Sequence, residues 1–453
     1  MTPFKLSELA PILNAELVGG DATVQHVSTD TRSIERQTLF IALIGERFDA
    51  HDFCHQAVTD GVTALLVSKK LDVAVPQLVV KDTQVALGQL GEWVHQQSKA
   101  LAIALTGSCG KTTVKEMLAE ILQLKGKVLA TAGNFNNEIG VPLTLLRAEP
   151  QDDYSIIELG ANHLNEIAYT TQLVKPDIAL VNNIAAAHLE GFGSLQGVAT
   201  AKAEIFQGLP TDGHAVVNSD SCDMMLWQTV LSDKKVTLFS LSNPETDFYA
   251  SHIVINHHGE ASFIMHTPDG ELDINLHLLG KHNISNALAA AALSMLAGAT
   301  LSEVKQGLER VRNVKGRVEV VKLTDTLTLI DDSYNASVPA MKSAAELLSS
   351  FQGERWLVLG YMAELGTESL ALHRQVGEYA AQFDFENVMT FGSDSKIISE
   401  LCNGMHFDCR EAMIAFLLQQ LDKQKNNEVT VLVKGANSSR MSDVVKALKE
   451  SNK

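Results

Sequence analysis

The sequence predicts an α/β protein with three domains, and two observations lead to this prediction. Short apolar runs bounded by turn residues alternate with segments of helical periodicity along most of the 453 residues, which is the pattern of parallel sheets covered by helices. Domains of roughly 100–200 residues would divide such a chain into two to four units. We expect a mixed α/β domain over residues 1–98, a parallel-sheet domain over 99–314 and a doubly wound, Rossmann-like domain over 315–453.

In the first domain, strand-like runs at residues 38–43 and 63–67 are separated by turn residues. A helix is predicted from about Val85 to Ser98 and closes the domain. The segment GERFDAHDF (45–53) is polar, charged and aromatic, which is more typical of a binding loop than of a core strand.

The central domain opens with the apolar strand LAIAL (101–105), followed by TGSCGKTT (106–113). Apolar residues then recur at i, i+3, i+4, i+7 and i+8 from Val114 onwards, which predicts an amphipathic helix. Gly126 stands where a C-terminal helix cap belongs. Further strands at 154–159 and 177–184 predict a parallel sheet with helices on both faces.

Two later regions complete the pattern. The Ala-rich stretch 287–299 predicts a buried helix, because it is shorter than the ~20 residues that cross a bilayer. After GRVEVVKL (316–323) the alternation restarts, and the third domain has predicted strands at 326–332, 356–360, 387–392 and 429–435. Its binding edge should lie at the carboxyl ends of these strands.

The composition limits the partners. A net charge of −18 argues against nucleic acid and anionic membrane surfaces, because phosphates attract basic surfaces, although a local cationic pocket for a phosphorylated small molecule is compatible with it. The five cysteines are scattered and show no metal-ligand spacing, which predicts reduced thiols in the cytoplasm. The N-terminus shows no secretory apolar segment. We expect a soluble, cytoplasmic, monomeric protein with small-molecule partners.

The strongest motif is the strand–TGSCGKT–helix unit. Backbone N–H groups of the turn from Gly107 to Gly110, together with the helix N-terminus, form a cradle for anions. Lys111 can reach the β- and γ-phosphates of a nucleotide, and the Thr112 hydroxyl can bind Mg²⁺. The general motif has glycine where this chain has Leu105, so the match is to a shorter form. A chance glycine turn is disfavoured because all parts occur in the required order.

Three residues near this motif are weaker candidates. Glu158 ends a predicted strand and is either a Mg²⁺ contact or an exposed carboxylate. His188 follows another predicted strand, and a lone histidine is more often a satisfied polar residue than a ligand. Lys202 is by default a helix-surface lysine. Cys109 lacks an identifiable base partner, so we assign it no catalytic role.

The third domain adds a second group of candidates. Asp331 and Asp332 end a predicted strand beside Tyr334 and Asn335. One of the two aspartates could instead cap the following helix. Arg317 is either a solvated linker charge or a cation that faces phosphate across a domain cleft.

Taken together, these segments resemble the Mur ligase family, the ATP-dependent amide-bond ligases of peptidoglycan precursor synthesis. The resemblance covers essentially the whole chain. It is carried, in the order of the family, by TGSCGKTT, NFNNEIGVP (134–142), IIELGAN (156–162), NNIAAAHLEGFG (182–193), KAEIF (202–206), LLGKHNISNALAA (278–290), KGRVE (315–319) and DDSYNA (331–336). Within the family, NFNNEIG, DDSYNA and LGYMAELG (359–366) are most similar to the branch that adds D-alanyl-D-alanine to a UDP-N-acetylmuramoyl (UDP-MurNAc) tripeptide.

The resemblance implies ATP-driven amide synthesis through an acyl phosphate, giving the UDP-MurNAc-pentapeptide. The terminal carboxylate of the tripeptide would attack the γ-phosphate, and the amine of D-alanyl-D-alanine would then displace phosphate. Such a site must supply positive charge and alignment, because a carboxylate is a poor acyl donor and the phosphate it attacks is anionic.

The resemblance also implies roles for individual residues. Lys111, His188 and Lys202 would be catalytic, with Lys202 carbamylated. Thr112, Glu158 and His188 would hold Mg²⁺, with two ions expected in the site. The nucleotide would contact Gly107, Ser108, Cys109, Gly110, Lys111, Thr112, Thr113, Asn137, His282, Asn286, Arg317, Asp331, Tyr334 and Asn335. The UDP-sugar would contact Ser28, Thr29, Asp30, Arg32, Arg47, Phe48 and His51.

Two residues depart from the family pattern. Tyr361 stands where an aspartate is expected, and Asn437 stands where a basic residue is more usual. Other readings are a folylpolyglutamate or cyanophycin synthetase-like ligase, or a nucleotide-binding regulator without turnover. A P-loop motor acting on nucleic acid is disfavoured by the negative charge.

Overall fold

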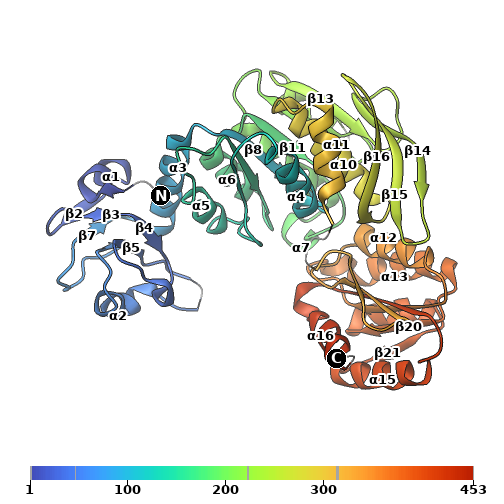
Figure 1. Cartoon of the computed structure of the whole chain (residues 1–453). Coiled ribbons are helices and arrows are strands. Elements are labelled where there is room, and N and C mark those ends of the chain that lie inside the picture. Colours follow the sequence, from blue (N-terminus) through green and yellow to red (C-terminus); the bar gives the residue numbers. More distant parts are fainter. Residues whose placement is uncertain (1–2, 46, 222–223, 313–315, 452–453) are drawn as a thin grey trace.

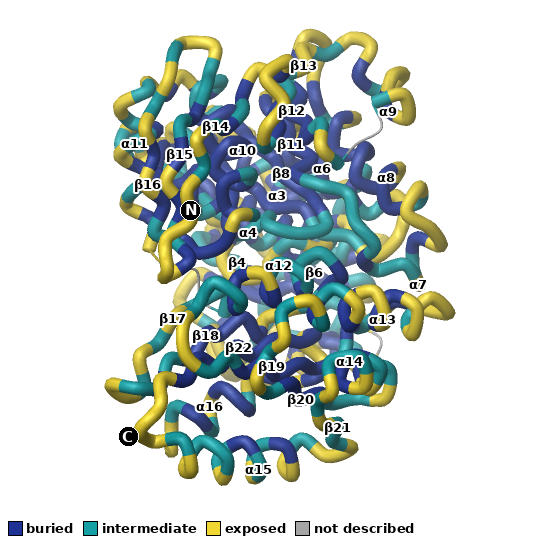
Figure 2. Tube along the Cα trace, turned by 90° about the vertical axis from the view of Figure 1, so that its right-hand side faces the viewer, coloured by how far each residue is buried: buried dark blue, intermediate teal, exposed yellow. Residues whose placement is uncertain are grey.

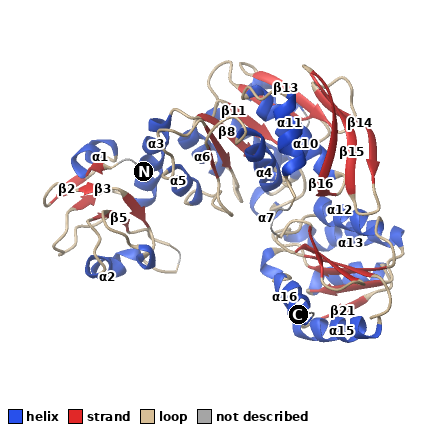
Figure 3. Cartoon of the chain, viewed as in Figure 1, coloured by secondary structure: helices blue, strands red, loops and turns tan. Residues whose placement is uncertain are grey.

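The computed structural model describes residues 3–45, 47–221, 224–312 and 316–451. Within these ranges the strands form three large sheets and one small one, and Figure 3 shows helices packed around each large sheet. The N-terminal and C-terminal parts lie on opposite sides of a central body (Figure 1). The predicted boundary at 314/315, Glu46 of the binding-loop segment and Cys222 lie outside the described residues.

The N-terminal part contains a five-stranded sheet of order β2-β7-β6-β5-β4, parallel except for β2. Side chains alternate between its faces. Leu39 and Ile41 pack with α1 and α3, whereas Phe40 packs with α2 on the other face. The elements are β1 Phe4–Lys5, α1 Leu6–Ile12, β2 Glu16–Val18, β3 Thr23–Val24, β4 His26–Ser28, β5 Thr38–Ile41, α2 Cys54–Thr59, β6 Ala64–Val67, β7 Gln77–Val79 and α3 Thr83–Ser98.

The first half of the central part has the predicted strand–helix alternation. Ile103 and Leu105 of β8 face α4 and α10, while Ala102 and Ala104 face α5 and α6, so helices cover both faces as expected. The elements are β8 Leu101–Thr106, α4 Lys111–Leu122, β9 Val128–Ala130, α5 Gly140–Leu145, β10 Tyr154–Glu158, α6 Glu166–Val174, β11 Ile178–Val181, α7 Leu189–Phe192, α8 Leu195–Ala203, β12 His214–Asn218, α9 Met224–Leu231 and β13 Lys235–Ser240.

The central sheet is parallel from β8 to β13 as predicted, but it continues into strands that we did not predict. It has nine strands in the order β16-β15-β14-β13-β12-β11-β8-β10-β9, and β15 runs antiparallel to both of its neighbours, β14 and β16. Helices α10 and α11 pack against these strands. The elements are β14 Phe248–Ile255, β15 Glu260–Thr267, β16 Gly270–Leu279, α10 His282–Leu296 and α11 Leu301–Arg310.

The C-terminal part is a six-stranded sheet of order β17-β18-β22-β19-β20-β21. It is parallel and covered on both faces as predicted, except that β17 runs antiparallel to β18. The elements are β17 Glu319–Lys322, β18 Leu327–Asp332, α12 Val338–Ser349, β19 Glu354–Gly360, α13 Ser369–Ala380, β20 Asn387–Phe391, α14 Lys396–Leu401, β21 Met405–Phe407, α15 Arg410–Lys423, β22 Val429–Lys434 and α16 Ser442–Ser451.

Gly126 does not cap α4. The helix ends at Leu122 with Gln123 as its C-cap, and the N–H of Gly126 donates to the carbonyl of Leu122 (3.0 Å) one turn later. Glycine is needed at this position for close approach, because a Cβ there would lie 2.4 Å from Asp153 Oδ2.

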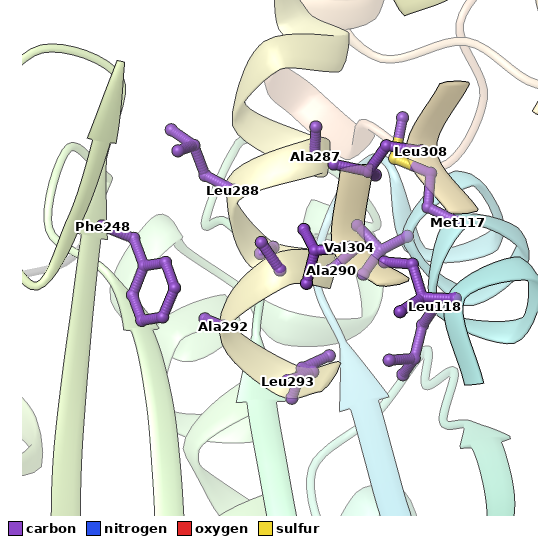
Figure 4. Packing of buried hydrophobic residues seen from close by; sticks show 14 of the residues in the cluster. Met117, Leu118, Phe248, Ala287, Leu288, Ala290, Ala292, Leu293, Val304 and Leu308 are labelled. Carbon is purple, nitrogen blue, oxygen red and sulfur yellow. The ribbon is translucent and has the colours of Figure 1, made fainter. Parts of the chain in front are cut away.

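Helix α10 is the centre of the largest core, and Figure 2 shows it dark blue, as buried as the neighbouring strands. In Figure 4, Leu288 and Phe248 lie on one side of α10, and Met117 of α4 lies on the other. This arrangement confirms the predicted buried helix. Among the described residues, none of the helices combines the length and apolarity that a membrane span requires.

Truncation of this core should destabilise the protein strongly. Leu288 is fully buried, so Leu288→Ala should lower the free energy of unfolding by about 2–5 kcal/mol. Leu370→Ala is the matched control, because Leu370 is 56% exposed and surface truncations cost at most about 0.5 kcal/mol. Denaturant unfolding followed by circular dichroism measures both, and equal losses would contradict this view of the core.

Candidate active site

A cavity of about 620 Å³ lies between the central and C-terminal sheets. The segment TGSCGKTT (106–113), called the phosphate loop below, forms one wall, and loops after β18, β19 and β22 form the other. The predicted site residues that line it are Ser108, Cys109, Gly110, Lys111, Thr113, His188, His282, Asn286, Arg317, Tyr334 and Asn335. The structure therefore brings together residues that are separated by more than 200 positions in the sequence.

The phosphate loop has a conformation that only glycine tolerates at one key point. Gly110 has φ +78°, and a Cβ there would lie 2.4 Å from Asn286 Oδ1. Lys111 begins α4, and its Nζ donates to the carbonyl of Gly107 (2.7 Å). Burial lowers the pKa of Lys111, while nearby Glu158 acts in the opposite direction. Among the described residues, the one hydrogen bond of this cation is therefore to a neutral carbonyl.

Asparagine side chains hold this loop from behind. Asn182 Nδ2 donates to the carbonyl of Cys109 and to Asn286 Oδ1, both at 3.0 Å. Asn183 Oδ1 accepts from the N–H of Cys109 (2.8 Å). In this structure Asn286, predicted as a nucleotide contact, is 4% exposed and also braces the loop. Asn182 and Asn183 were not predicted individually, although both stand in the NNIAAAHLEGFG segment.

A buried carboxylate lies beside the start of α4. Glu158 is 2% exposed, and its two oxygens accept from Thr112 Oγ1 (3.0 Å) and Asn136 Nδ2 (2.8 Å). A hydroxyl next to a carboxylate is a suitable pair of oxygen ligands for Mg²⁺. Within the described ranges, no three His, Cys, Asp or Glu side chains are grouped so as to hold a metal ion on their own.

Asn137 lies apart from the cavity lining. Its Oδ1 accepts from the N–H of Gly140 (2.8 Å) at the start of α5. The neighbouring Asn136, which we did not predict, makes the contact with Glu158 instead. The sequence alone offers no signal that separates these two adjacent asparagines.

The amine of Lys202 is buried and has no polar partner among the residues that the structure describes. It is 2% exposed, and the described residues provide no hydrogen bond or ion pair to its Nζ, which lies 5.5 Å from the centre of the Phe192 ring. Burial, followed by the charge of Lys111, lowers the pKa of Lys202 to about 7. The same Phe192 ring packs edge-on against His188 (6.5 Å between centroids). Burial also lowers the pKa of His188, while its bond to Glu364 opposes the shift.

The C-terminal wall contributes charged residues of both signs. Arg317 stacks on the Tyr334 ring (4.6 Å), so it lies in the cavity rather than in a solvated linker. Asp332 lines the cavity and pairs with the buried Lys434 (2.5 Å). Asp331 does not line the cavity; its Oδ1 accepts from the N–H (3.1 Å) and hydroxyl (2.6 Å) of Ser333. The aspartate that lines the cavity is therefore Asp332, because adjacent strand residues point to opposite faces.

The predicted UDP-sugar residues lie at the carboxyl edge of the N-terminal sheet, after β4 and β5. Arg32 is bonded to Asp30 (2.6 Å), and Phe48 is exposed and packs edge-on against Phe53 (6.4 Å). His51 is only 3% exposed. Its Nδ1 is bonded to Asp49 (2.5 Å), and its Nε2 accepts from the N–H of Ser68 (2.9 Å). In this structure His51 anchors the loop to β6, which leaves its ring nitrogens occupied.

The remaining predicted residues of this group keep the same edge together. Ser28 Oγ donates to the carbonyl of Asp30 (2.8 Å) and lies 3.0 Å from Ser33 Oγ. Thr29 and Arg47 lie in the adjoining segments of the edge, and Arg47 is exposed.

The two departures from the family pattern are close to one another. The Tyr361 hydroxyl donates to Ser438 Oγ (3.2 Å), and its ring packs over Gly392, where a Cβ would lie 2.5 Å from Tyr361 Cδ1. Asn437 and Ser438 line the cavity. A neutral hydroxyl–hydroxyl contact therefore occupies the place where an aspartate was expected.

The central part carries a phosphate loop that faces the doubly wound C-terminal part across one cavity. This arrangement is typical of one class of ATP-dependent ligase, and two family models match the chain. The Mur ligase middle domain matches residues 105–294, and the family described as "Mur ligase, glutamate ligase domain" matches residues 316–437. The chain therefore belongs to the Mur ligase family.

Individual relatives are more specific. The chain is 52% identical over 451 residues to the UDP-N-acetylmuramoyl-tripeptide–D-alanyl-D-alanine ligase of Escherichia coli K12, with 99% of both chains covered. It is similar in structure to MurF from Acinetobacter baumannii, with TM-score 0.94, 33% identity and 99% of both chains covered. The MurF ligase of Thermotoga maritima, solved in complex with ADP, superposes with TM-score 0.84 at 25% identity, covering 95% of this chain and 98% of that chain.

Proposed function

We propose that this chain joins D-alanyl-D-alanine to UDP-N-acetylmuramoyl-tripeptide at the expense of ATP, as the names of its full-length relatives state for those proteins. The observation that carries the proposal is that Lys111 and Arg317 line one cavity that is built from two sheets, with the buried Lys202 close enough to Lys111 for the charge of Lys111 to lower its pKa. Concentrated positive charge is what phosphoryl transfer to a carboxylate requires. Full-length identity to these ligases favours this function over the folylpolyglutamate-type and regulatory readings.

The residues fit ATP and Mg²⁺. The cradle at Gly110 leaves no room for a side chain, and Lys111 is placed to exchange its bond with the Gly107 carbonyl for phosphate oxygens. Thr112 and Glu158 would hold one Mg²⁺ and His188 a second, and bound Mg²⁺ would offset the negative charge of the phosphates. Arg317 would supply a further positive charge from the C-terminal wall.

The chemistry proceeds in two steps. An oxygen of the tripeptide carboxylate attacks the γ-phosphorus, the bond to the β–γ bridging oxygen breaks, and ADP leaves. The amine of the dipeptide then attacks the acyl carbon, phosphate departs with its bonding electrons, and the amine loses one proton. Lys111 stabilises the charge that develops on the transferred group, while the rigid asparagine bracing of its loop keeps it aligned.

We assign Lys202 a carbamate. A neutral amine at this position can attack the carbon of CO₂, forming an N–C bond and releasing one proton, and a pKa of about 7 keeps much of Lys202 neutral at physiological pH. The carbamate anion would give the buried Nζ region the oxygen atoms that its surroundings lack, and it would support the second Mg²⁺.

The edge of the N-terminal sheet would receive the UDP-sugar. Exposed Phe48 offers an aromatic face, and exposed Arg32 and Arg47 offer positive charge to a diphosphate. We propose a monomer as the functional unit, because the central and C-terminal parts of one chain supply both walls of the cavity. We place the enzyme in the cytoplasm, where reduced thiols are stable.

The test is phosphate release from ATP with the UDP-MurNAc-tripeptide and D-alanyl-D-alanine added separately and then together. Release and a new amide product should occur only when both are present. Replacing UDP-MurNAc-tripeptide by a folate is the matched control for the alternative ligase class. Release that neither substrate changes would contradict the proposal.

A further inference from the structure

One loop of the C-terminal part reaches across to the segment that carries His188. Residues 363–366 follow β19 and lie against α7, which Figure 1 places at the junction of the central and C-terminal parts. The N–H of Glu190 donates to the carbonyl of Glu364 (3.1 Å), and the Glu364 side chain is bonded to His188 Nδ1 through Oε2. Gly366 comes close to Glu190 as well; a Cβ there would lie 3.7 Å from Glu190 Cα. Main chain and side chain thus hold the same short segment.

Both partners of this contact have unusual backbone conformations. Glu364 has φ +60° and His188 has φ +54°, in the left-handed region that non-glycine residues rarely adopt. Such conformations persist where the surrounding structure holds them, and they cluster at functional sites. Glu364 and His188 also line the proposed ATP cavity.

The chemistry of the pair determines the imidazole tautomer. An ionised carboxylate can only accept a hydrogen bond, so His188 Nδ1 must carry the hydrogen. Nε2 is then the atom that can present a lone pair. Metal-binding histidines commonly donate their other ring N–H to a carboxylate, which orients the ring and fixes its tautomer.

We propose that Glu364 is a positioning residue that fixes the tautomer and orientation of His188, and that it does so only while the loop 363–366 is seated on α7. The inference rests on the proposed function for the role of His188, and it adds a physical link between domain arrangement and the metal site. In an arrangement where the C-terminal part swings away, His188 loses its carboxylate and the second Mg²⁺ is held less well. Catalysis is thereby confined to the closed arrangement.

Other groups around His188 do not substitute for Glu364. Phe192 contacts the ring edge-on and offers no acceptor. Lys111 and Lys202 are near enough to lower the proton affinity of the ring, but both are donors. Among the described residues, Glu364 is the one that hydrogen-bonds to the His188 ring.

The test compares Glu364→Gln and Glu364→Ala with Glu368→Gln in the full-length chain. Glu368 is an exposed carboxylate in the 3-10 helix Gly366–Glu368, two residues beyond the loop, so it controls for loss of surface charge. The Glu364 variants should need about 10–100-fold more Mg²⁺ for half-maximal turnover, with the KM for ATP at saturating Mg²⁺ changed less than about twofold. Glu368→Gln should match the unsubstituted protein.

A second readout is independent of turnover. In ¹⁵N-histidine NMR spectra, with the signal assigned by its loss in His188→Gln, His188 should show the Nδ1–H tautomer in the unsubstituted protein and lose it in Glu364→Ala. An unchanged tautomer together with unchanged Mg²⁺ dependence would overturn the inference, even if the melting temperature fell, because the role would then be structural only. Absence of turnover in the unsubstituted protein would refute the proposed function instead, and the NMR comparison would still decide the inference.

Discussion

Lys111→Ala should abolish ligation while leaving the protein folded. The loss of kcat/KM should be about 10³-fold or more, which is the scale of removing one preorganised charge at a transferring phosphoryl group. The reason is local: Lys111 Nζ is held at the Gly107 carbonyl inside the phosphate loop. On the other wall, Arg317 is stacked on Tyr334 and Lys434 is paired with Asp332. Coupled measurement of ADP release and amide product gives the effect.

The matched control for this prediction is Lys125→Ala. Lys125 lies beyond the opposite end of α4, paired with Glu303 at 3.7 Å, and such pairs are worth at most about 1 kcal/mol. Its activity should remain within about twofold of the unsubstituted protein. Circular dichroism should show that Lys111→Ala is folded, because the substitution removes a buried positive charge and so does not destabilise the fold. ATP-dependent ligation at a normal rate by Lys111→Ala would refute the phosphate-loop assignment.

The parts of the site that sequence predicts well are those in which function depends on consecutive residues. The phosphate loop joins a strand to a helix over 106–113, so the order of residue types alone indicates the cradle, and the structure places it at the cavity. The contact between Glu158 and Thr112 is also foreseeable, because Glu158 ends β10 and Thr112 lies at the start of the helix that follows the neighbouring parallel strand β8.

The order of residue types does not predict which of two adjacent, chemically similar residues lies in the site. Asp331 and Asp332 have the same chemistry, and only the strand's alternation relative to the cavity places Asp332 inside it. Asn136 and Asn137 pose the same problem. The contact of Glu364 with His188 spans 176 positions, so no local signal links them. Long-range contacts of this kind require the fold.

The antiparallel strands β14, β15 and β16 are a different case. The run Pro268–Asp269–Gly270 between two alternating segments is a turn signal, and the structure turns at Pro268–Asp269 between β15 and β16. The information was therefore present in the sequence. The expectation of a parallel sheet gave too much weight to the strand–helix alternation that precedes it.

Substitution of Lys202 should also reduce activity strongly, but for a reason that depends on CO₂. Lys202→Ala and Lys202→Arg should both lose about 10²–10³-fold in kcat, a scale appropriate to one electrostatic element of an active site. Arginine keeps a positive charge but cannot form the carbamate. Equal loss in both variants would therefore show that the amine matters as a nucleophile toward CO₂ and not as a cation.

The unsubstituted protein gives the sharper test of the same assignment. Burial lowers the pKa of Lys202 to about 7, so the neutral amine dominates above this pH and is lost as the pH falls below it. Turnover should therefore decline below about pH 7, and in CO₂-depleted buffer it should decline at every pH and recover when bicarbonate is added. Lys202→Arg serves as the control because its residual activity should ignore bicarbonate. If CO₂ does not change the activity of the unsubstituted protein, the carbamate assignment is wrong. The buried Nζ of Lys202 would then bind substrate or metal-bound groups instead.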